Sequence, residues 1–242
     1  MTLAAISSPA RRLAALAAAA VLVAACAVPT NKPTPSATPA PTIPPAVPSY
    51  VLGPTLAPDC GSSAPFPLPV GATSTVTMVT NFGTIVISVD ATLGPNAAGA
   101  FTALARCGYY NNVLFHRIVP KFALQAGDGQ YARLPNITPE KMGSGGPSWT
   151  IPDDKVTKTY TRGMVCMARK STKDSGNSQF FIVLDDSAAG QLSAQGYNNY
   201  AQFGYVTSGM DVVDRIAQIP TGGDNNMALQ AAVILSTTVT VP

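Results

Sequence analysis

The sequence predicts a mainly β fold, a closed antiparallel barrel with two α-helices. From about Gly71 onward, short alternating or apolar runs are separated by turn residues, as expected for a sheet of many short strands. Only two segments show apolar residues at helical spacing, and no internal repeat is visible. Many short strands with few helices favour a barrel, because closing the sheet removes its unpaired edges.

Each predicted strand is a short alternating or wholly apolar run. The runs are Thr75–Thr80, Thr84–Val89, Leu114–Val119, Ala123–Ala126, Gly163–Ala168, Gln179–Leu184, Ala201–Val206 and Ala231–Val241. Between the first two, Asn81-Phe82-Gly83 indicates a hairpin turn. One helix is predicted over Ala97–Cys107, opened by Gly94-Pro95-Asn96, and a second over Met210–Ala217.

Residues 1–25 have the pattern of a signal peptide that is removed on export. Arg11-Arg12 precede the apolar run Leu13–Val23, which is too short to span a membrane comfortably. Val23-Ala24-Ala25-Cys26 resembles a bacterial lipobox, in which the cysteine is lipidated and becomes the new N-terminus. The alternative is an ordinary secreted protein cut at an Ala-x-Ala site. We expect a lipoprotein anchored through Cys26 to the cell membrane and facing the extracytoplasmic side.

A proline-rich segment follows the lipidation site. Thirteen of the 22 prolines fall between Pro29 and Pro69, interleaved with Thr, Ser and Ala. Such a stretch cannot bury enough apolar surface to order itself, and proline favours extended conformations. We therefore expect residues 26–70 to form a disordered tether and residues 71–242 to form the folded domain. A proline-rich ligand for another module is the alternative reading of the tether.

Charge and cysteine content exclude two classes of site. Charged residues make up 11% of the chain and the net charge is only +3, which argues against a nucleic-acid partner. Beyond Cys26, the spacings of Cys60, Cys107 and Cys166 match no zinc pattern, so no metal is expected. Cys166 lies in an apolar run and should be a buried free thiol. Cys60 and Cys107 are the expected disulfide, which an exported protein can form.

The most informative stretch is Phe115–Asp128, which reads FHRIVPKFALQAGD. It places His116, the only histidine, and Arg117 in a strand-like run, with Phe122 and Gln125 before a Gly-Asp turn. The whole string resembles the signature of the cyclophilin family of peptidyl-prolyl cis-trans isomerases, and the similarity extends roughly from Val76 to Val241. The resemblance implies an eight-stranded antiparallel barrel capped by two helices, with an apolar groove that binds proline-containing polypeptides.

The implied reaction needs little chemical machinery. Rotation about a peptide bond faces a barrier of about 18–20 kcal/mol, and X-Pro bonds exchange slowly between two populated isomers. No bond is made or broken, so neither a nucleophile nor a metal nor a cofactor is required. In the twisted amide the prolyl nitrogen gains a lone pair, to which a fixed guanidinium can donate a hydrogen bond. Arg117 is the candidate for this role.

The resemblance assigns the other site residues position by position. Phe122 matches the family's proline pocket, and Gln125 matches a glutamine that binds the substrate backbone and helps to position the arginine. The remaining matched substrate-binding positions are Ala123, Ala168, Arg169, Phe181, Leu192 and Tyr200. Because adjacent strand residues face opposite sides, only one of Phe180 and Phe181 can line the groove, and the match selects Phe181.

Several positions depart from the family pattern. Ala123 stands where many members have methionine, and Arg169-Lys170 replace a common Asn-Ala pair. The segment Leu184–Tyr200 lacks the tryptophan of cyclosporin-binding members, and the only tryptophan, Trp149, lies in the loop Gly143–Asp154. We therefore expect weak inhibition by cyclosporin.

Other functions explain the sequence less well. His116 lacks the Gly-x-Ser-x-Gly context of a serine hydrolase, so we expect a structural histidine that is hydrogen-bonded inside the fold. Gly143–Gly146 lacks the Lys-Ser/Thr of a phosphate-binding loop. A catalytically weak binding or chaperone module remains the main alternative to an active isomerase, but the retained Arg117, Phe122 and Gln125 favour the enzyme. A proline-rich adhesin would not explain the signature. We expect a monomer.

Overall fold

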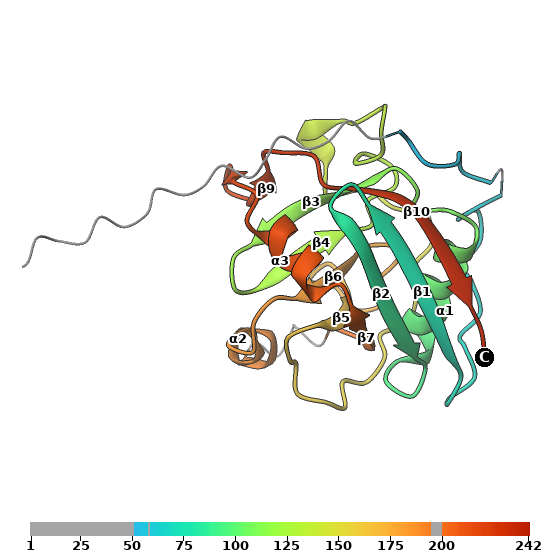
Figure 1. Ribbon diagram of the computed structural model, residues 1–242. Helices are drawn as coiled ribbons and strands as arrows, with labels where there is room; N and C mark the ends of the chain where they lie inside the picture. Colours follow the sequence, from blue (N-terminus) through green and yellow to red (C-terminus); the bar gives the residue numbers. More distant parts are fainter. Residues whose placement is uncertain (1–50, 58, 195–199) are drawn as a thin grey trace, which may run out of the picture. The chain divides into compact units, whose positions relative to one another are not determined.

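Strand β10 (Val233–Thr240) pairs with both β1 (Thr73–Thr80) and β3 (Val113–Val119), and this double pairing closes the sheet into a barrel (Figure 1). The computed structural model describes residues 51–57, 59–194 and 200–242. The other barrel strands are β2 (Gly83–Asp90), β4 (Ala123–Ala126), β5 (Met164–Met167), β6 (Phe180–Val183) and β7 (Gln202–Ser208). Their order is β10-β1-β2-β7-β5-β6-β4-β3, all antiparallel. The expected eight-stranded barrel is confirmed.

The predicted hairpin is also confirmed. Strands β1 and β2 pair in continuous register up to Thr80 opposite Gly83, so Asn81 and Phe82 form a two-residue loop. The Thr80 hydroxyl donates to the Gly83 carbonyl at 2.7 Å and accepts the Phe82 amide at 3.1 Å. Alternate residues of both strands are buried, so one face of the hairpin lines the core.

Helix α1 (Pro95–Arg106) supplies the centre of the core. The chain places a proline at its first turn, where the missing amide proton costs no hydrogen bond. The Asp154 carboxylate, from a distant loop, accepts the free amides of Asn96 and Ala97 at 3.2 and 2.8 Å. The ring of Phe101 then packs among three aromatic rings, those of Tyr110, Phe180 and Phe203, with centroids 4.8–5.3 Å away.

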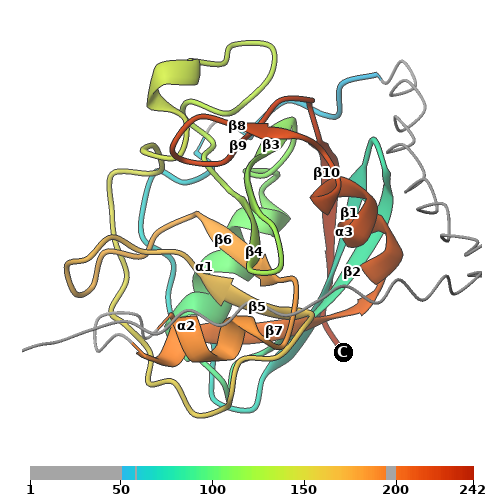
Figure 2. The ribbon, with the colours of Figure 1, turned by 90° about the vertical axis from the view of Figure 1, so that its left-hand side faces the viewer.

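The second predicted helix, α3 (Met210–Ala217), buries Val212, Val213 and Ile216 and packs on β2. The sequence pattern predicts none of three further short elements, which are too short to show a period. These are α2 (Ala188–Ala194), a 3₁₀ helix at Pro139–Lys141, and a ribbon of β8 (Thr221–Gly222) and β9 (Met227–Ala228). The ribbon pairs onto β3 at Arg117 (Figure 2).

The end of the expected tether is part of the folded domain. Gly53 exchanges hydrogen bonds with the Asn112 side chain, and the Leu68 amide donates to the Pro95 carbonyl at 3.1 Å. The expectation of disorder up to residue 70 is therefore wrong for residues 51–57 and 59–70. Proline prevents regular structure in this segment, but it leaves backbone carbonyls and the remaining amides free to bind the domain surface. Residues 1–50, which include the expected signal peptide and Cys26, lie outside the described residues.

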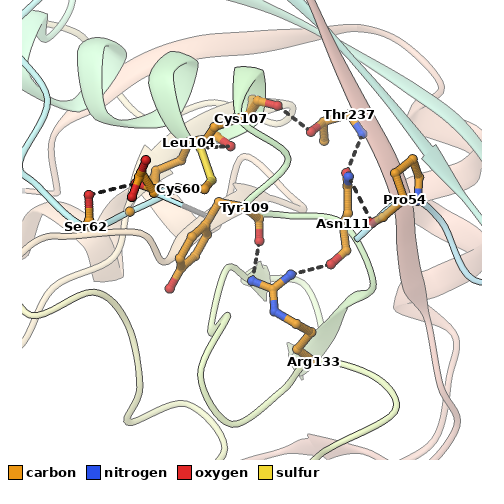
Figure 3. The surroundings of a disulfide bond; sticks show 12 residues. Pro54, Cys60, Ser62, Leu104, Cys107, Tyr109, Asn111, Arg133 and Thr237 are labelled. Atoms are coloured by element: carbon orange, nitrogen blue, oxygen red, sulfur yellow. Dashed lines mark hydrogen bonds between the residues drawn. A yellow bond between two sulfur atoms is a disulfide. The ribbon is translucent and has the colours of Figure 1, made fainter. Parts of the chain in front are cut away.

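Both cysteine expectations are confirmed. Cys60 and Cys107 form a disulfide between residues 47 positions apart in the sequence. It fastens the N-terminal segment to the end of α1 (Figure 3). Cys166 is a fully buried free thiol on β5. Within the described ranges, no helix is long and apolar enough to cross a membrane.

We predict that Phe101→Ala destabilises the domain by about 3–5 kcal/mol, because the cavity would open at the centre of the aromatic cluster. Urea unfolding followed by far-ultraviolet circular dichroism measures the change in free energy. Phe66→Ala is the matched control, since the Phe66 side chain is 91% exposed, and it should change stability by less than about 0.5 kcal/mol. Equal losses in the two variants would contradict this account of the core.

Candidate functional site

One row of side chains crosses three neighbouring barrel strands. Arg117 on β3 pairs with Gln125 on β4, and Gln125 pairs with Phe181 on β6. Directly paired residues project to the same face of a sheet. The antiparallel register therefore places the candidate catalytic arginine, the glutamine and an aromatic ring side by side.

The guanidinium of Arg117 is held on two sides. Its Nη1 donates to Gln125 Oε1 at 3.3 Å, and its Nε donates to the Asn225 carbonyl at 3.2 Å. Asn225 lies in the turn of the β8–β9 ribbon. Nη2 has no hydrogen-bond partner among the described residues. The side chain is thus fixed while one of its donor groups stays free.

A second glutamine continues this network. Gln125 Nε2 donates to Gln179 Oε1 at 2.9 Å, and Gln179 Nε2 donates to the carbonyls of Gly143 and Gly145 at 3.0 and 2.8 Å. The buried Asp128 carboxylate holds the same loop by accepting the amides of Gly143 and Gly145 at 2.7 and 3.1 Å. Sequence reasoning missed Gln179, although a polar residue directly before the apolar run of β6 could have drawn attention to it.

A pocket of about 170 Å³ lies beside Arg117. It is lined by all but one of the residues that the sequence predicted, namely Arg117, Phe122, Ala123, Gln125, Ala168, Arg169, Phe181 and Tyr200. The rings of Phe181 and Tyr200 meet edge to face at 5.1 Å. Phe180, on the opposite face of β6, is buried in the barrel core, so the choice of Phe181 agrees with its position.

Leu192 does not line this pocket. It is 1% exposed and belongs to the apolar cluster that includes Ala123 and Phe181. The expectation that it contacts substrate is therefore not met by its placement. The family resemblance could match Leu192, on the short helix α2, by its position in the sequence. It could not predict that the side chain is buried.

Arg169 is engaged by its own loop. Its Nη2 lies 3.4 Å from Asp153 Oδ2, and its Nη1 donates to the carbonyls of Lys170 and Thr172 at 3.0 and 3.2 Å. Only 8% of its side chain is exposed. Arg169 and Ala168 also border a smaller pocket of about 90 Å³ beside Gln179, so the groove continues past the first pocket.

The site has the form expected of a proline-binding groove, and comparison with known proteins decides its family. Residues 75–239 match the family described as cyclophilin type peptidyl-prolyl cis-trans isomerase/CLD. The chain belongs to the cyclophilin family. It is therefore a peptidyl-prolyl cis-trans isomerase. Within the described ranges, no cluster of three or more His, Cys, Asp or Glu residues could hold a metal ion.

Bacterial cyclophilins and a parasite structure give the extent of the likeness. A probable peptidyl-prolyl cis-trans isomerase of Brucella abortus is 34% identical over 145 residues, covering 59% of this chain and 71% of the relative. An isomerase of Acinetobacter baylyi is 34% identical over 168 residues, covering 68% and 85%. A cyclophilin-type isomerase structure from Cryptosporidium parvum has a TM-score of 0.57 at 24% identity, covering 69% of this chain and 98% of that one; this last likeness concerns the fold.

Partial burial shapes the electrostatics of the cyclophilin site. Desolvation lowers the pKa of Arg117 from its ordinary value, and the nearby Tyr200 hydroxyl raises it in part. A guanidinium remains charged at any physiological pH. A cation in a partly dry pocket is a stronger hydrogen-bond donor than the same group in water.

His116 lies next to Arg117 in sequence but outside the candidate site. It is 2% exposed, and neither ring nitrogen makes a hydrogen bond of normal geometry within the described part of the chain. The Leu114 backbone lies near enough to act on the ring as a hydrogen-bond partner, so the expectation of a hydrogen-bonded histidine stays a prediction. Desolvation lowers the pKa of His116 to about 4, against smaller opposing effects of Asp128 and the Leu114 backbone, and Arg117 lowers it further. At neutral pH the ring is uncharged.

We predict that this cyclophilin loses stability as the pH falls from about 6.5 to about 4. The folded pKa of His116 lies below its ordinary value of 6.5, so the unfolded chain binds the extra proton in this window and protonation favours unfolding. Below about pH 4 both states are protonated, and this contribution stops changing. Proton NMR can follow the titration directly, since the chain has only one histidine.

A His116→Gln variant is the control for this pH dependence. Unfolding by urea at pH 7 and pH 4.5 should show a smaller pH-dependent loss of stability in the variant than in the natural chain. A histidine pKa near 6.5 in the folded protein, or an unchanged pH dependence in the variant, would contradict the account.

Proposed function

We propose that this isomerase accelerates X-Pro isomerisation in exported proteins, with Arg117 stabilising the twisted amide. The observation that carries the proposal is the guanidinium held by Gln125 and the Asn225 carbonyl, on a residue that lines the pocket together with Phe122 and Phe181. A donor that is fixed before substrate arrives need not reorganise during the reaction. This arrangement supports a catalytic arginine rather than a solvated surface one.

The apolar side of the pocket serves the proline ring. Phe122, Ala123 and Phe181 form a surface against which a pyrrolidine ring can pack, while the polypeptide before the proline rotates about the C–N bond. In the planar ground state the prolyl nitrogen has no available lone pair, because it is delocalised into the carbonyl. The hydrogen bond from Arg117 therefore forms only as the amide twists, and an interaction gained only in the transition state lowers the barrier.

Gln125 has two tasks in this proposal. Its Oε1 and one of its amide protons are used by Arg117 and Gln179, and a primary amide carries a second proton that can bind a substrate carbonyl. The Cryptosporidium parvum relative was also crystallised in the presence of the dipeptide Ala-Pro. A proline-containing polypeptide is accordingly the substrate that we propose here.

The cellular setting is proposed from the N-terminal sequence. The lipobox-like Val23–Cys26 and the signal-like residues before it support export, followed by anchoring through a lipid on Cys26. The Cys60–Cys107 disulfide supports the same setting, because disulfides persist mainly outside the reducing cytoplasm. We propose a monomeric enzyme there, one that cyclosporin inhibits weakly. The alternative to an active enzyme is a weak binding or chaperone module. A measurement of isomerase activity distinguishes the two.

We predict that Arg117→Ala lowers kcat/KM by about a hundredfold or more, the usual cost of losing a preorganised transition-state donor. The kcat/KM of Arg117→Lys should lie between those of the natural chain and Arg117→Ala, because lysine keeps the charge but not the planar fork of donors. A protease-coupled assay of an Ala-Pro peptide with the full chain measures both variants. Arg106→Ala, at an exposed arginine on α1, is the matched control and should retain full activity.

Two results would overturn the proposal. Full activity in Arg117→Ala would exclude the arginine mechanism while leaving the enzyme. A folded natural chain that binds proline peptides without accelerating their isomerisation would favour the binding module.

A further inference from the structure

A disulfide-fastened segment lies against the far side of the site's supporting loop. We call residues 59–70 the strap. Cys60 joins Cys107 at the end of α1, and the hydroxyl and amide of Ser62 both donate to the Asp59 carbonyl, at 2.8 and 3.1 Å (Figure 3). These bonds form a tight turn around Gly61, whose φ of +81° is a conformation that favours glycine. The turn presents the Gly61 carbonyl outward from the disulfide.

Trp149 binds this carbonyl. Its indole Nε1 donates to the Gly61 oxygen at 2.9 Å, and its half-buried ring packs against the barrel core. Trp149 lies in the same loop as Gly143 and Gly145, whose carbonyls accept hydrogen bonds from Gln179. The strap is therefore connected through one loop to the glutamine that supports Gln125.

A second contact reaches the other side of Gln179. A side chain at Gly61 would meet the Tyr109 ring at 3.1 Å, so the bare glycine sits directly on that ring. The Tyr109 hydroxyl accepts a 3.4 Å hydrogen bond from Ser178, the residue before Gln179. The strap thus contacts the loop directly through Trp149, and it reaches the residue before Gln179 only through Tyr109.

The disulfide is the covalent fastening of the strap and lies at its N-terminal end. Phe66 and Val70 are 91% and 74% exposed. At the far end of the strap, Leu68 packs against the core and its amide donates to the Pro95 carbonyl at 3.1 Å. The hydrogen bonds of Gly53 to Asn112 lie upstream and fix a different point of the chain. Without the covalent link, the position of the Gly61 carbonyl would depend on a few partly exposed hydrogen bonds, each of which is weak in net terms.

We propose that the strap is a positioning element of the active site and that the redox state of Cys60–Cys107 sets the turnover rate. The inference rests on the proposed function of Arg117. In the disulfide form, the strap holds Trp149 and thereby fixes the glycine-rich loop. The loop positions Gln179, which holds Gln125, and Gln125 keeps Arg117 oriented. A dithiol reductant breaks the sulfur–sulfur bond, supplying two electrons and two protons to give two thiols, and is itself oxidised to a disulfide. Release of the strap then loosens the loop and lowers kcat.

The test compares the full chain in its disulfide form with the same chain after reduction by a dithiol. We expect kcat to fall by about threefold to tenfold, the range for losing about one hydrogen bond's worth of orientation, with a smaller change in KM. The emission of Trp149, the only tryptophan, should change on reduction as its ring loses the strap. The ¹⁵N signal of Arg117 Nε, identified by its loss in Arg117→Lys, should shift.

Substitutions separate positioning from general loss of structure. Trp149→Phe keeps an aromatic ring but cannot donate a hydrogen bond to the Gly61 carbonyl. The substitution should therefore lower kcat by a similar factor, and reduction of this variant should lower kcat little further. A Cys60→Ala, Cys107→Ala double variant should have the kcat of the reduced chain, and the dithiol should not change this kcat. Val51→Ala, at an 88% exposed position outside the strap, should behave as the natural chain in both redox states.

The outcomes are distinct from those that test Arg117. Equal kcat in the two redox states, or a Trp149→Phe variant that still loses the full factor on reduction, would overturn the strap proposal while leaving the arginine mechanism intact. A chain that is inactive in both states would instead refute the proposed function. If the double cysteine variant fails to fold, reduction of the natural chain and the Trp149→Phe variant still decide the question.

Discussion

The hydrogen-bond chain from Arg117 through Gln125 and Gln179 to the glycine-rich loop is the interaction on which the site depends. Prolyl isomerisation breaks no bond, so in the proposed mechanism the protein needs only a pocket and one oriented donor. A flexible arginine on a barrel surface would spend much of its time in solvent. Here Asp128 fixes the loop, and two glutamine side chains link that loop to the guanidinium. Each glutamine both donates and accepts a hydrogen bond in this link. The orientation of a single side chain is thus a property of several elements of the fold.

The barrel makes this chain possible because its strand order brings distant segments together. Strands β3 and β4 are neighbours in sequence, but β6 comes much later in the chain and joins them by pairing with β4. The row from Arg117 to Gln125 to Phe181 follows from that register. The residues on the opposite face, such as Phe180, fill the core around Phe101 and make the same strands rigid. Stability and function are divided between the two faces of the same three strands.

Local pattern predicted most of the fold and most of the pocket. Alternating or wholly apolar runs located the eight barrel strands, and the resemblance to the cyclophilin family over Val76–Val241 located the seven other pocket residues by their matched positions. Long-range contacts account for what it missed. Leu192 is buried rather than exposed to the groove, and the proline-rich residues 51–57 and 59–70 are attached to the domain. Each of these features depends on contacts with residues distant in sequence, which the pattern of neighbouring residues does not specify.

A double-mutant cycle between Arg117 and Gln179 tests the central claim most directly. Gln179→Leu removes both halves of the link, and isomerisation rates of an Ala-Pro peptide would be measured by NMR exchange spectroscopy with the full chain. If Gln179 acts by orienting the guanidinium, its substitution should lower kcat by about tenfold in the natural background and by less than twofold once Arg117 is already lysine. Independent losses that multiply in the double variant would contradict the claim, because they would mean that Gln179 supports activity without acting through Arg117.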